Sequence, residues 1–280
     1  MSIRGKNNLI QPILKWVGGK RQLISEIEKY IPKKYTTYYE PFMGGGAVFF
    51  HLQPKKAILN DINSELINVY NVLKNNIDEL IENLEKHENT SEYFYKMRGK
   101  DREEEYKKLS NIEKASRIIY LNKTCYNGLF RVNSSGEFNT PFGDYKNPNI
   151  VNEYVLKAVN RYLNNIDVEF HNVDFFEILK NVKKGSFVYL DPPYDPISQT
   201  SSFTGYDKGG FSKKEQEKLK EACDELNRKG VKFLLSNSST EFIRELYKDY
   251  KIETIKAKRS INSKSNLRGE IEEVLVRNYE

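Results

Sequence analysis

The chain has few cysteines and no long apolar run. Cys125 and Cys223 are its two cysteines among 280 residues, too few for a disulfide framework, and we interpret both as structural. The apolar runs are far shorter than a membrane span, and residues 1–16 contain no stretch typical of a secretory signal. We therefore expect a soluble protein in the cytoplasm that has no membrane partner.

Glycine and proline are also scarce, with 16 and 9 residues. Together with 30% charged and 12% aromatic residues, these counts exclude collagen-like, low-complexity and largely disordered chains. A chain of this length can bury a full core, either as one large domain or as one domain that carries an inserted second one.

Basic residues exceed acidic ones, 45 to 39, which gives a formal net charge of +6. This excess alone is weak evidence for a polyanionic partner. Its distribution is more informative, because residues 1–25 and 256–268 contain no Asp or Glu. We interpret the cations of both segments as candidate phosphate contacts. Residues 96–109 instead mix both signs, which predicts a solvated helix face.

Strand and helix patterns alternate along most of the chain. A strand is predicted at 38–42, and a second strand at 56–59 precedes a helix with one apolar face. The capping box from Ser212 to Glu215 opens a later helix, which Gly230 ends. Further strands are predicted at 167–170, 186–190, 232–235 and 273–279. The alternation predicts an α/β fold with a mostly parallel, doubly wound sheet.

Residues 76–149 do not follow this alternation. They are helical first and then form a polar loop rich in Asn and Gly, "TCYNGLFRVNSSGEFNTPFGDYKNP". We interpret the segment as an insertion with its own function, and we expect residues 1–75 and 150–280 to form the main domain.

The stretch "EPFMGGGAVFF" places three glycines between a predicted strand and a predicted helix. A chain must turn tightly there and let a ligand approach its backbone. The pattern is neither a Walker loop nor GxGxxG, and plain turn chemistry explains it equally well in isolation. However, Asp61 ends the next strand, where a carboxylate can bind a ribose hydroxyl. The pair indicates a cofactor that contains a nucleoside.

The stretch "VYLDPPY" ends another strand with a carboxylate, two prolines and a tyrosine. Two prolines fix two φ angles and remove two backbone donors, so the strand must end at Asp191. In an open α/β sheet, ligands bind at the carboxyl ends of the strands. A rigid turn with an exposed tyrosine is the alternative.

These stretches occur in an order that resembles a known family. "LKWVGGKRQL", "EPFMGGGAVFF", "NDIN", the polar loop, "DPPY", "SNSS" and "RSINSKSNLRG" are similar to the elements of DNA adenine methyltransferases of the Dam and DpnM type, which methylate the adenine of GATC. The resemblance extends over essentially the whole chain. It implies a Rossmann-like S-adenosylmethionine-dependent methyltransferase sheet whose mainly helical insertion, residues 76–149, recognises double-stranded DNA.

The resemblance also implies a set of cofactor-binding residues. Trp16 and Lys20 would lie beside S-adenosylmethionine, although in isolation they would be read as a core aromatic residue and a surface cation. The glycine turn would hold the methionine part, Asp61 the ribose and Asp174 the adenine. The complete implied set is Trp16, Lys20, Glu40, Phe42, Gly44, Gly46, Asp61, Asp174 and Asp191.

The chemistry of methyl transfer explains the composition of the "DPPY" turn. An adenine amino group is a poor nucleophile because its lone pair is delocalised into the ring. The Asp191 carboxylate and the Pro192 carbonyl can accept its two hydrogens and localise that lone pair. Pro193 keeps the turn rigid, and Tyr194 can stack on a base that has left the duplex. Neither a covalent nucleophile nor a metal site is expected.

The polar loop carries the expected DNA contacts. Arg131 matches the family's guanine-binding arginine, and an arginine fork on guanine is a common specific contact, although an arginine in a polar loop is usually only solvated. We expect further contacts from Lys15 and the C-terminal basic segment. The implied DNA-binding residues are Lys15, Tyr126, Asn127, Leu129, Arg131, Pro141, Tyr145, Arg259, Lys264 and Arg268.

Two other functions compete with this interpretation. One is an amino-methyltransferase that acts on cytosine, RNA or protein; Asp191 argues against cytosine, since cytosine enzymes more often have Ser before the prolines. The other is a silent DNA-binding protein, which the complete set of chemical residues disfavours. We expect a monomer or a weak dimer. The sequence does not distinguish the modification half of a restriction system from a solitary enzyme.

Overall fold

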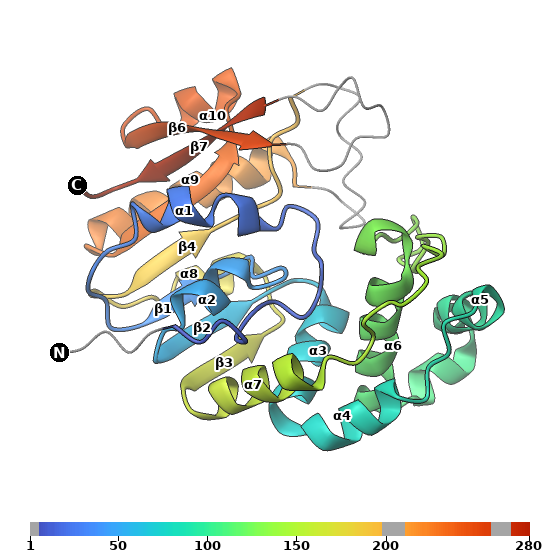
Figure 1. The fold of residues 1–280 in the computed structure, drawn as a ribbon. Helices are drawn as coiled ribbons and strands as arrows, with labels where there is room; N and C mark the ends of the chain where they lie inside the picture. The colour runs from blue at the N-terminus through green and yellow to red at the C-terminus, as the bar shows by residue number, and fades with distance from the viewer. Residues whose placement is uncertain (1–5, 198–210, 259–269) are drawn as a thin grey trace.

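A single mixed sheet forms the centre of the molecule (Figure 1). The computed structural model describes residues 6–197, 211–258 and 270–280, and in these ranges seven strands pair in the order β3-β2-β1-β4-β5-β7-β6. The strands are β1 Tyr38–Glu40, β2 Lys56–Asn60, β3 Asp167–His171, β4 Phe187–Leu190, β5 Lys232–Ser238, β6 Lys251–Lys258 and β7 Glu270–Arg277.

The sheet confirms the predicted α/β class. Strands β3, β2, β1, β4 and β5 are parallel, whereas β7 runs antiparallel to both β5 and β6. The sequence analysis missed β6 because it treated the end of this strand as part of a basic DNA-binding segment. Its residues Lys256–Lys258 pair in register with β7.

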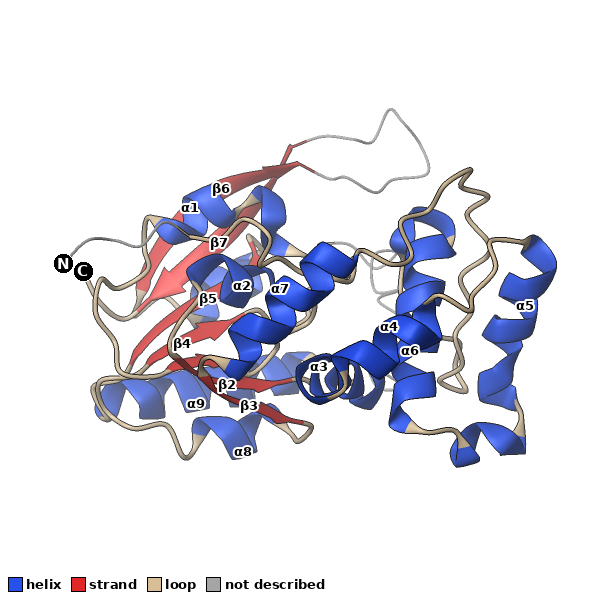
Figure 2. Ribbon diagram, turned by 60° about the horizontal axis from the view of Figure 1, so that its bottom comes forward, coloured by secondary structure: helices blue, strands red, loops and turns tan. Residues whose placement is uncertain are grey.

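Helices cover both faces of the sheet (Figure 2). On one face the core includes α1 Ile24–Glu28, α2 Ala47–Leu52, α3 Ser64–Asn75 and α7 Glu153–Asn164; on the other it includes α8 Phe175–Leu179, α9 Lys213–Arg228 and α10 Glu241–Leu246. Neighbouring strand residues alternate between the two cores, as Tyr38 and Tyr39 do. The predicted capping box opens α9, and Gly230 follows its end at φ +68°.

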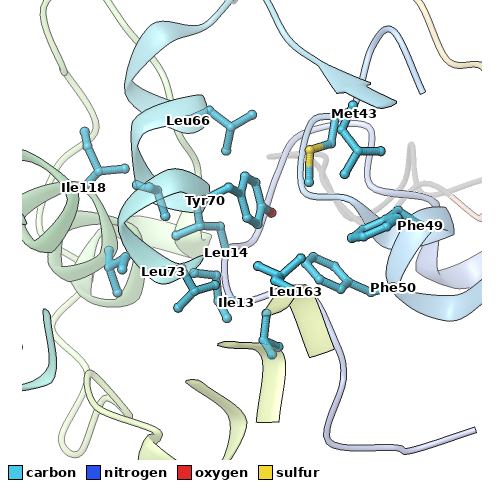
Figure 3. Packing of buried hydrophobic residues seen from close by; sticks show 14 of the residues in the cluster. Ile13, Leu14, Met43, Phe49, Phe50, Leu66, Tyr70, Leu73, Ile118 and Leu163 are labelled. Atoms are coloured by element: carbon cyan, nitrogen blue, oxygen red, sulfur yellow. The ribbon is translucent and has the colours of Figure 1, made fainter. Parts of the chain in front are cut away.

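The segment predicted as an insertion is mainly helical. It contains α4 Ile77–Leu84, α5 Ser91–Gly99 and α6 Asn111–Thr124, together with the short 3-10 helices Lys100–Arg102, Glu104–Lys108 and Tyr126–Gly128. A further 3-10 helix, Lys20–Gln22, lies in the N-terminal segment. Figure 3 shows α3 between Ile118 of α6 and Phe50 of α2. Because one apolar cluster continues from the sheet into these helices, the proposed domain boundaries remain a prediction.

Residues 96–109 differ from the expected solvated helix. They form the end of α5 and two 3-10 helices, and two of their charges contact the polar loop. Asp101 Oδ2 accepts a hydrogen bond from the Phe138 N–H at 2.7 Å, and Arg102 Nη2 donates to the Phe138 carbonyl at 3.0 Å. Residues 96–109 therefore help to hold the polar loop in place through the backbone of Phe138.

A buried arginine holds this support in place. Arg117 of α6 is 1% exposed, and its Nη2 lies 2.9 Å from Asp101 Oδ2. Its Nε donates to the Met97 carbonyl at 2.7 Å, and its Nη2 donates to the Arg98 carbonyl at 2.9 Å. One guanidinium therefore joins α6 to α5 and, through Asp101, to the polar loop.

Replacement of this arginine should strongly destabilise the protein. Arg117→Met leaves the Asp101 carboxylate without its buried partner, so the free energy of unfolding in urea should fall by ~3–5 kcal/mol. The control is Arg228→Met, which removes an exposed ion pair with Glu225 and should cost at most about 1 kcal/mol. Equal stability of the two variants would show that the Arg117 pair contributes little.

Candidate active site

The predicted catalytic and cofactor-binding elements meet at one edge of the sheet. The glycine turn follows β1, Asp61 follows β2, and the Asp191–Tyr194 turn follows β4. These three strands are neighbours and parallel, so their carboxyl ends lie side by side. This is the edge at which open α/β sheets bind ligands.

Asp61 holds the glycine turn. Gly44 and Gly46 have positive φ angles of +50° and +66°, which glycine adopts without strain. The Gly44 N–H donates to Asp61 Oδ2 at 2.8 Å, and the Asn63 N–H donates to Asp61 Oδ1 at 2.9 Å. Each carboxylate oxygen accepts more than one hydrogen bond, so Asp61 can hold the turn and still bind a ligand hydroxyl.

Trp16 closes the glycine turn from the other side. A methyl group on Gly44 would lie 2.8 Å from Trp16 Cδ1, so only glycine fits against the indole. The indole also stacks on Phe130 of the polar loop, with ring centroids 4.7 Å apart. Trp16 thus lies between the glycine turn and the loop, and Phe130 is a contact that the sequence analysis did not identify.

Glu40 lies beneath the site and is 2% exposed. The Tyr38 hydroxyl donates to its Oε2 at 2.8 Å. Burial raises the pKa of Glu40 well above its ordinary value, and the nearby carboxylates of Asp191 and Asp61 add to this rise. Three acidic side chains therefore converge where the three strands end.

Lys20 and Asp191 form an ion pair inside this acidic group. Lys20 Nζ lies 2.9 Å from Asp191 Oδ1 and donates to the Gly18 carbonyl at 2.7 Å. Burial raises the pKa of Asp191 to about 6, and the Lys20 charge opposes that rise.

Tyr194 is held by contacts of its hydroxyl group and of its ring. Its hydroxyl donates to Glu273 Oε2 of β7 at 2.7 Å, and Lys20 Nζ lies 4.6 Å from the centroid of its ring. Sequence reasoning missed Glu273, because it looked like one of several acids in a charged strand. Its role becomes visible only when β7 pairs beside β5.

Two further predicted cofactor-binding residues are Phe42, at the start of the glycine turn, and Asp174, expected at the adenine of the cofactor. Phe42 is half-buried and packs on Phe175 of α8 with ring centroids 5.1 Å apart. Asp174 is exposed and caps α8, since its Oδ1 accepts the Phe176 N–H at 2.9 Å. The capping bond accounts for Asp174 by itself, so its contact with a cofactor stays a prediction.

The described DNA-binding candidates lie together around the polar loop. Tyr126 is 57% exposed, and its N–H binds the Pro141 carbonyl at 2.9 Å. The Asn127 N–H donates to the Tyr145 hydroxyl at 2.9 Å. Leu129 is half-buried, while Lys15, Asn127, Arg131 and Pro141 are exposed. Arg259, Lys264 and Arg268 lie outside the described residues.

A buried asparagine connects this loop to the N-terminal segment. Asn122 of α6 is 1% exposed. Its Oδ1 accepts the Lys15 N–H at 2.9 Å, and its Nδ2 donates to the carbonyls of Lys15 at 2.8 Å and Gly128 at 3.1 Å. The cofactor side and the loop side of the site are therefore held in one framework.

Other kinds of chemistry find little support in the described part of the chain. Cys125 and Cys223 are both buried, and burial raises the pKa of Cys125 to about 12, so neither is an activated thiol. Residues 6–197, 211–258 and 270–280 contain no group of His, Cys, Asp and Glu side chains suited to a metal ion. No helix among them could cross a membrane.

The converging carboxylates, the glycine turn and the turn with two prolines thus lie together at the carboxyl edge of the sheet, where enzymes with an open α/β sheet bind their ligands. Residues 16–261 match the family model described as D12 class N6 adenine-specific DNA methyltransferase. The chain therefore belongs to this family, and it is an adenine-specific DNA methyltransferase, as the resemblance implied.

Similar proteins agree with this assignment over nearly their full length. The chain is 46% identical to Type II methyltransferase M1.LlaDCHI of Lactococcus lactis subsp. cremoris, covering 100% of this chain and 99% of the relative. It is 42% identical to Type II methyltransferase M.MjaIII of Methanocaldococcus jannaschii, over 96% and 99%. It is 35% identical to DNA adenine methylase of Escherichia coli K12, over 94% and 93%.

The Lys20–Asp191 pair predicts the acid side of the pH profile. If the ionised Asp191 carboxylate accepts from the substrate, the single-turnover rate should fall about tenfold per pH unit below pH 6, where this group protonates. Lys20→Met removes the opposing cation, so the pKa of Asp191 should rise and the acid limb should move to higher pH. Lys248→Met, at an exposed lysine, is the control. An unshifted limb in Lys20→Met would contradict the pairing.

Proposed function

We propose that the enzyme transfers a methyl group from S-adenosylmethionine to the exocyclic amino group of adenine in double-stranded GATC. The observation that carries this proposal is the Asp191 carboxylate, whose buried Oδ1 lies 2.9 Å from the Lys20 ammonium at the carboxyl end of the sheet. It follows β4, beside the glycine turn that follows β1. A carboxylate has about four acceptor sites, so Asp191 can accept from an amino group of the substrate as well as from Lys20.

The residues of the site suit S-adenosylmethionine. The Glu40 carboxyl group interacts with the carboxylates of Asp191 and Asp61, and the charge of these two aspartates complements a sulfonium and an α-ammonium group. The glycines let Trp16 pack against the turn, which places an aromatic ring beside the site, and Phe42 is half-buried at the start of the same turn. When bound, this cofactor supplies a methyl group activated for direct transfer.

The protein's part in the reaction is to prepare the adenine nitrogen. The Asp191 carboxylate and the Pro192 carbonyl accept the two amino hydrogens, which localises the lone pair and directs it at the methyl group. The target base must leave the duplex to reach this edge of the sheet, and stacking on Tyr194 offsets part of the unpairing cost of about a few kcal/mol. No covalent bond to the enzyme forms.

Arg131 is proposed to read the guanine of GATC. Its Nε donates to Asn139 Oδ1 at 2.7 Å, and Arg131 itself is exposed. Its Nη2 also donates to the Asn139 carbonyl at 3.4 Å. These two contacts orient the guanidinium and leave both N–H groups of Nη1 and one of Nη2, enough for the two acceptors of guanine. Lys15, Tyr126, Asn127, Leu129, Pro141 and Tyr145 are proposed to contact the DNA around it.

The relatives favour a role in restriction and modification. Two of the similar proteins, at 46% and 42% identity, are type II methyltransferases, whereas the Escherichia coli DNA adenine methylase is 35% identical. We therefore favour the modification enzyme of a type II system over a solitary methylase. Action on DNA agrees with the cytoplasmic location expected from the sequence, and the monomeric or weakly dimeric state remains a prediction.

The site specificity and the chemistry can be tested together. Plasmid treated with the enzyme and cofactor should become resistant to an endonuclease blocked by GATC methylation, and full sensitivity would rule out this target. Asp191→Ala should abolish protection by lowering the single-turnover rate far more than tenfold. Its affinity for cofactor and DNA should stay within about tenfold, or ~1.4 kcal/mol. A variant with near-normal turnover would remove Asp191 from the chemistry.

The reading of guanine can be separated from phosphate binding. Arg131→Ala should cost ~1–3 kcal/mol of binding on GATC and much less on a site altered at that guanine. Arg268→Ala, proposed to remove a phosphate contact, should weaken binding to all sequences alike and reduce the salt slope by about one unit. Competition binding over single-base variants at several salt concentrations measures both. Equal losses at every site in Arg131→Ala would make Arg131 a phosphate contact.

A further inference from the structure

A buried polar network lies behind the Asp191–Tyr194 turn. Gln216 of α9 and Asn237 of β5 are both 0% exposed. Gln216 Nε2 donates to the Pro193 carbonyl at 2.9 Å, and Asn237 Nδ2 donates to Gln216 Oε1 at 3.1 Å. The two amides thus connect the turn to the helix and the strand behind it.

The same network holds the next residue of the turn, Asp195. Asn237 Oδ1 accepts the Asp195 N–H at 3.1 Å and the Ser238 N–H at 2.8 Å. Ser238 Oγ donates to the Asp195 carbonyl at 2.7 Å, and Thr240 Oγ1 donates to Asp195 Oδ2 at 2.7 Å. Both backbone polar groups of Asp195 are therefore bound by side chains of β5, and its carboxylate is bound by Thr240.

The turn needs this external support because of its composition. Pro192 and Pro193 have no N–H groups, so the turn cannot hold itself by backbone hydrogen bonds as a strand or helix would. Proline fixes φ but leaves ψ free to rotate each carbonyl. A hydrogen bond to the Pro193 carbonyl restricts that rotation and leaves the preceding carbonyl, that of Pro192, as the proposed acceptor for the substrate.

We propose that Gln216 and Asn237 are positioning residues for methyl transfer, which fix the direction of the Asp191 and Pro192 acceptors through the backbone of Pro193 and Asp195. This inference rests on the acceptor roles given to Asp191 and Pro192 under the proposed function. Displacement of a reacting group by about 1 Å can lower a rate about a hundredfold, so a loosened turn acts on the chemical step more than on binding.

A second buried asparagine provides a matched comparison. Asn60 at the end of β2 is 1% exposed. Its Nδ2 donates to the carbonyls of Pro41 and Val173 at 3.0 Å each, and its Oδ1 accepts the Val173 N–H at 3.0 Å. Asn60 therefore supports the glycine turn in the way that Asn237 supports the catalytic turn. A loss of Asn60 should act on cofactor binding instead.

The test compares rates and affinities of folded variants on a DNA that the wild-type enzyme methylates. Gln216→Met keeps the side-chain length but removes the bond to Pro193, and Ser238→Ala removes the bond to the Asp195 carbonyl. We expect the single-turnover rate to fall at least about tenfold in Gln216→Met and less in Ser238→Ala. The dissociation constants of S-adenosylmethionine and DNA should stay within about threefold of wild type. Asn60→Asp should show the reverse, with weaker cofactor binding and a nearly normal rate at saturating cofactor.

Thermal melting first establishes that each variant is folded at the assay temperature. If Gln216→Met does not fold, Ser238→Ala decides alone. Wild-type rates in the folded variants would overturn the inference, and so would losses of binding that equal the loss of rate. An active Asp191→Ala would instead overturn the proposed chemistry. If Asp191→Ala is inactive while Gln216→Met and Ser238→Ala turn over normally, the positioning role is wrong and the proposed chemistry stands.

Discussion

The proposed chemistry depends on keeping the Asp191 carboxylate ionised although its surroundings are largely buried. Asp191 follows the central strand β4, and burial alone favours its neutral form. The Lys20 ammonium opposes this effect from 2.9 Å away. Lys20 belongs to the segment before the first strand, so that segment must be fastened to the sheet edge for the charge to be in place. The contacts of Trp16 with the glycine turn and of Asn122 with Lys15 provide the fastening.

Three buried asparagines serve the same physical purpose at three places. Asn60, Asn122 and Asn237 are each at most 1% exposed, and each side chain binds the backbone of segments distant in sequence. Turns that face a ligand have few backbone hydrogen bonds of their own. A buried amide can both donate and accept, so it replaces those bonds without adding charge. The site is thus rigid although its residues lie on loops.

Much of the fold was predictable because several apolar strands are followed directly by turn-forming residues. The glycines after Glu40 and the prolines after Asp191 marked two strand ends and located the site. Strand β6 was not predicted, since "KIETIKAK" has four charged residues and its last three residues were assigned to the basic C-terminal segment, whereas the strand pairs with β7. The supporting residues carried less signal: Asn237 and Ser238 belong to the "SNSS" stretch of the resemblance, but the sequence did not indicate which turn they hold. Gln216 looked like one polar residue among many in α9, and only the tertiary fold buries it.

The contact between Trp16 and Phe130 limits how the enzyme can change its target. The loop proposed to read DNA is not independent of the rest of the site. Its Phe130 ring stacks on Trp16, which packs against the glycine turn. The Asn122 side-chain amide donates to the carbonyls of both Lys15 and Gly128. A loop transplanted from a relative with another target would have to bring a matching ring and a glycine at these two points. A change in the DNA sequence that the enzyme prefers is therefore expected in the exposed side chains of the loop. The residues on its inner side, Phe130 and Gly128, must keep their contacts with Trp16 and Asn122.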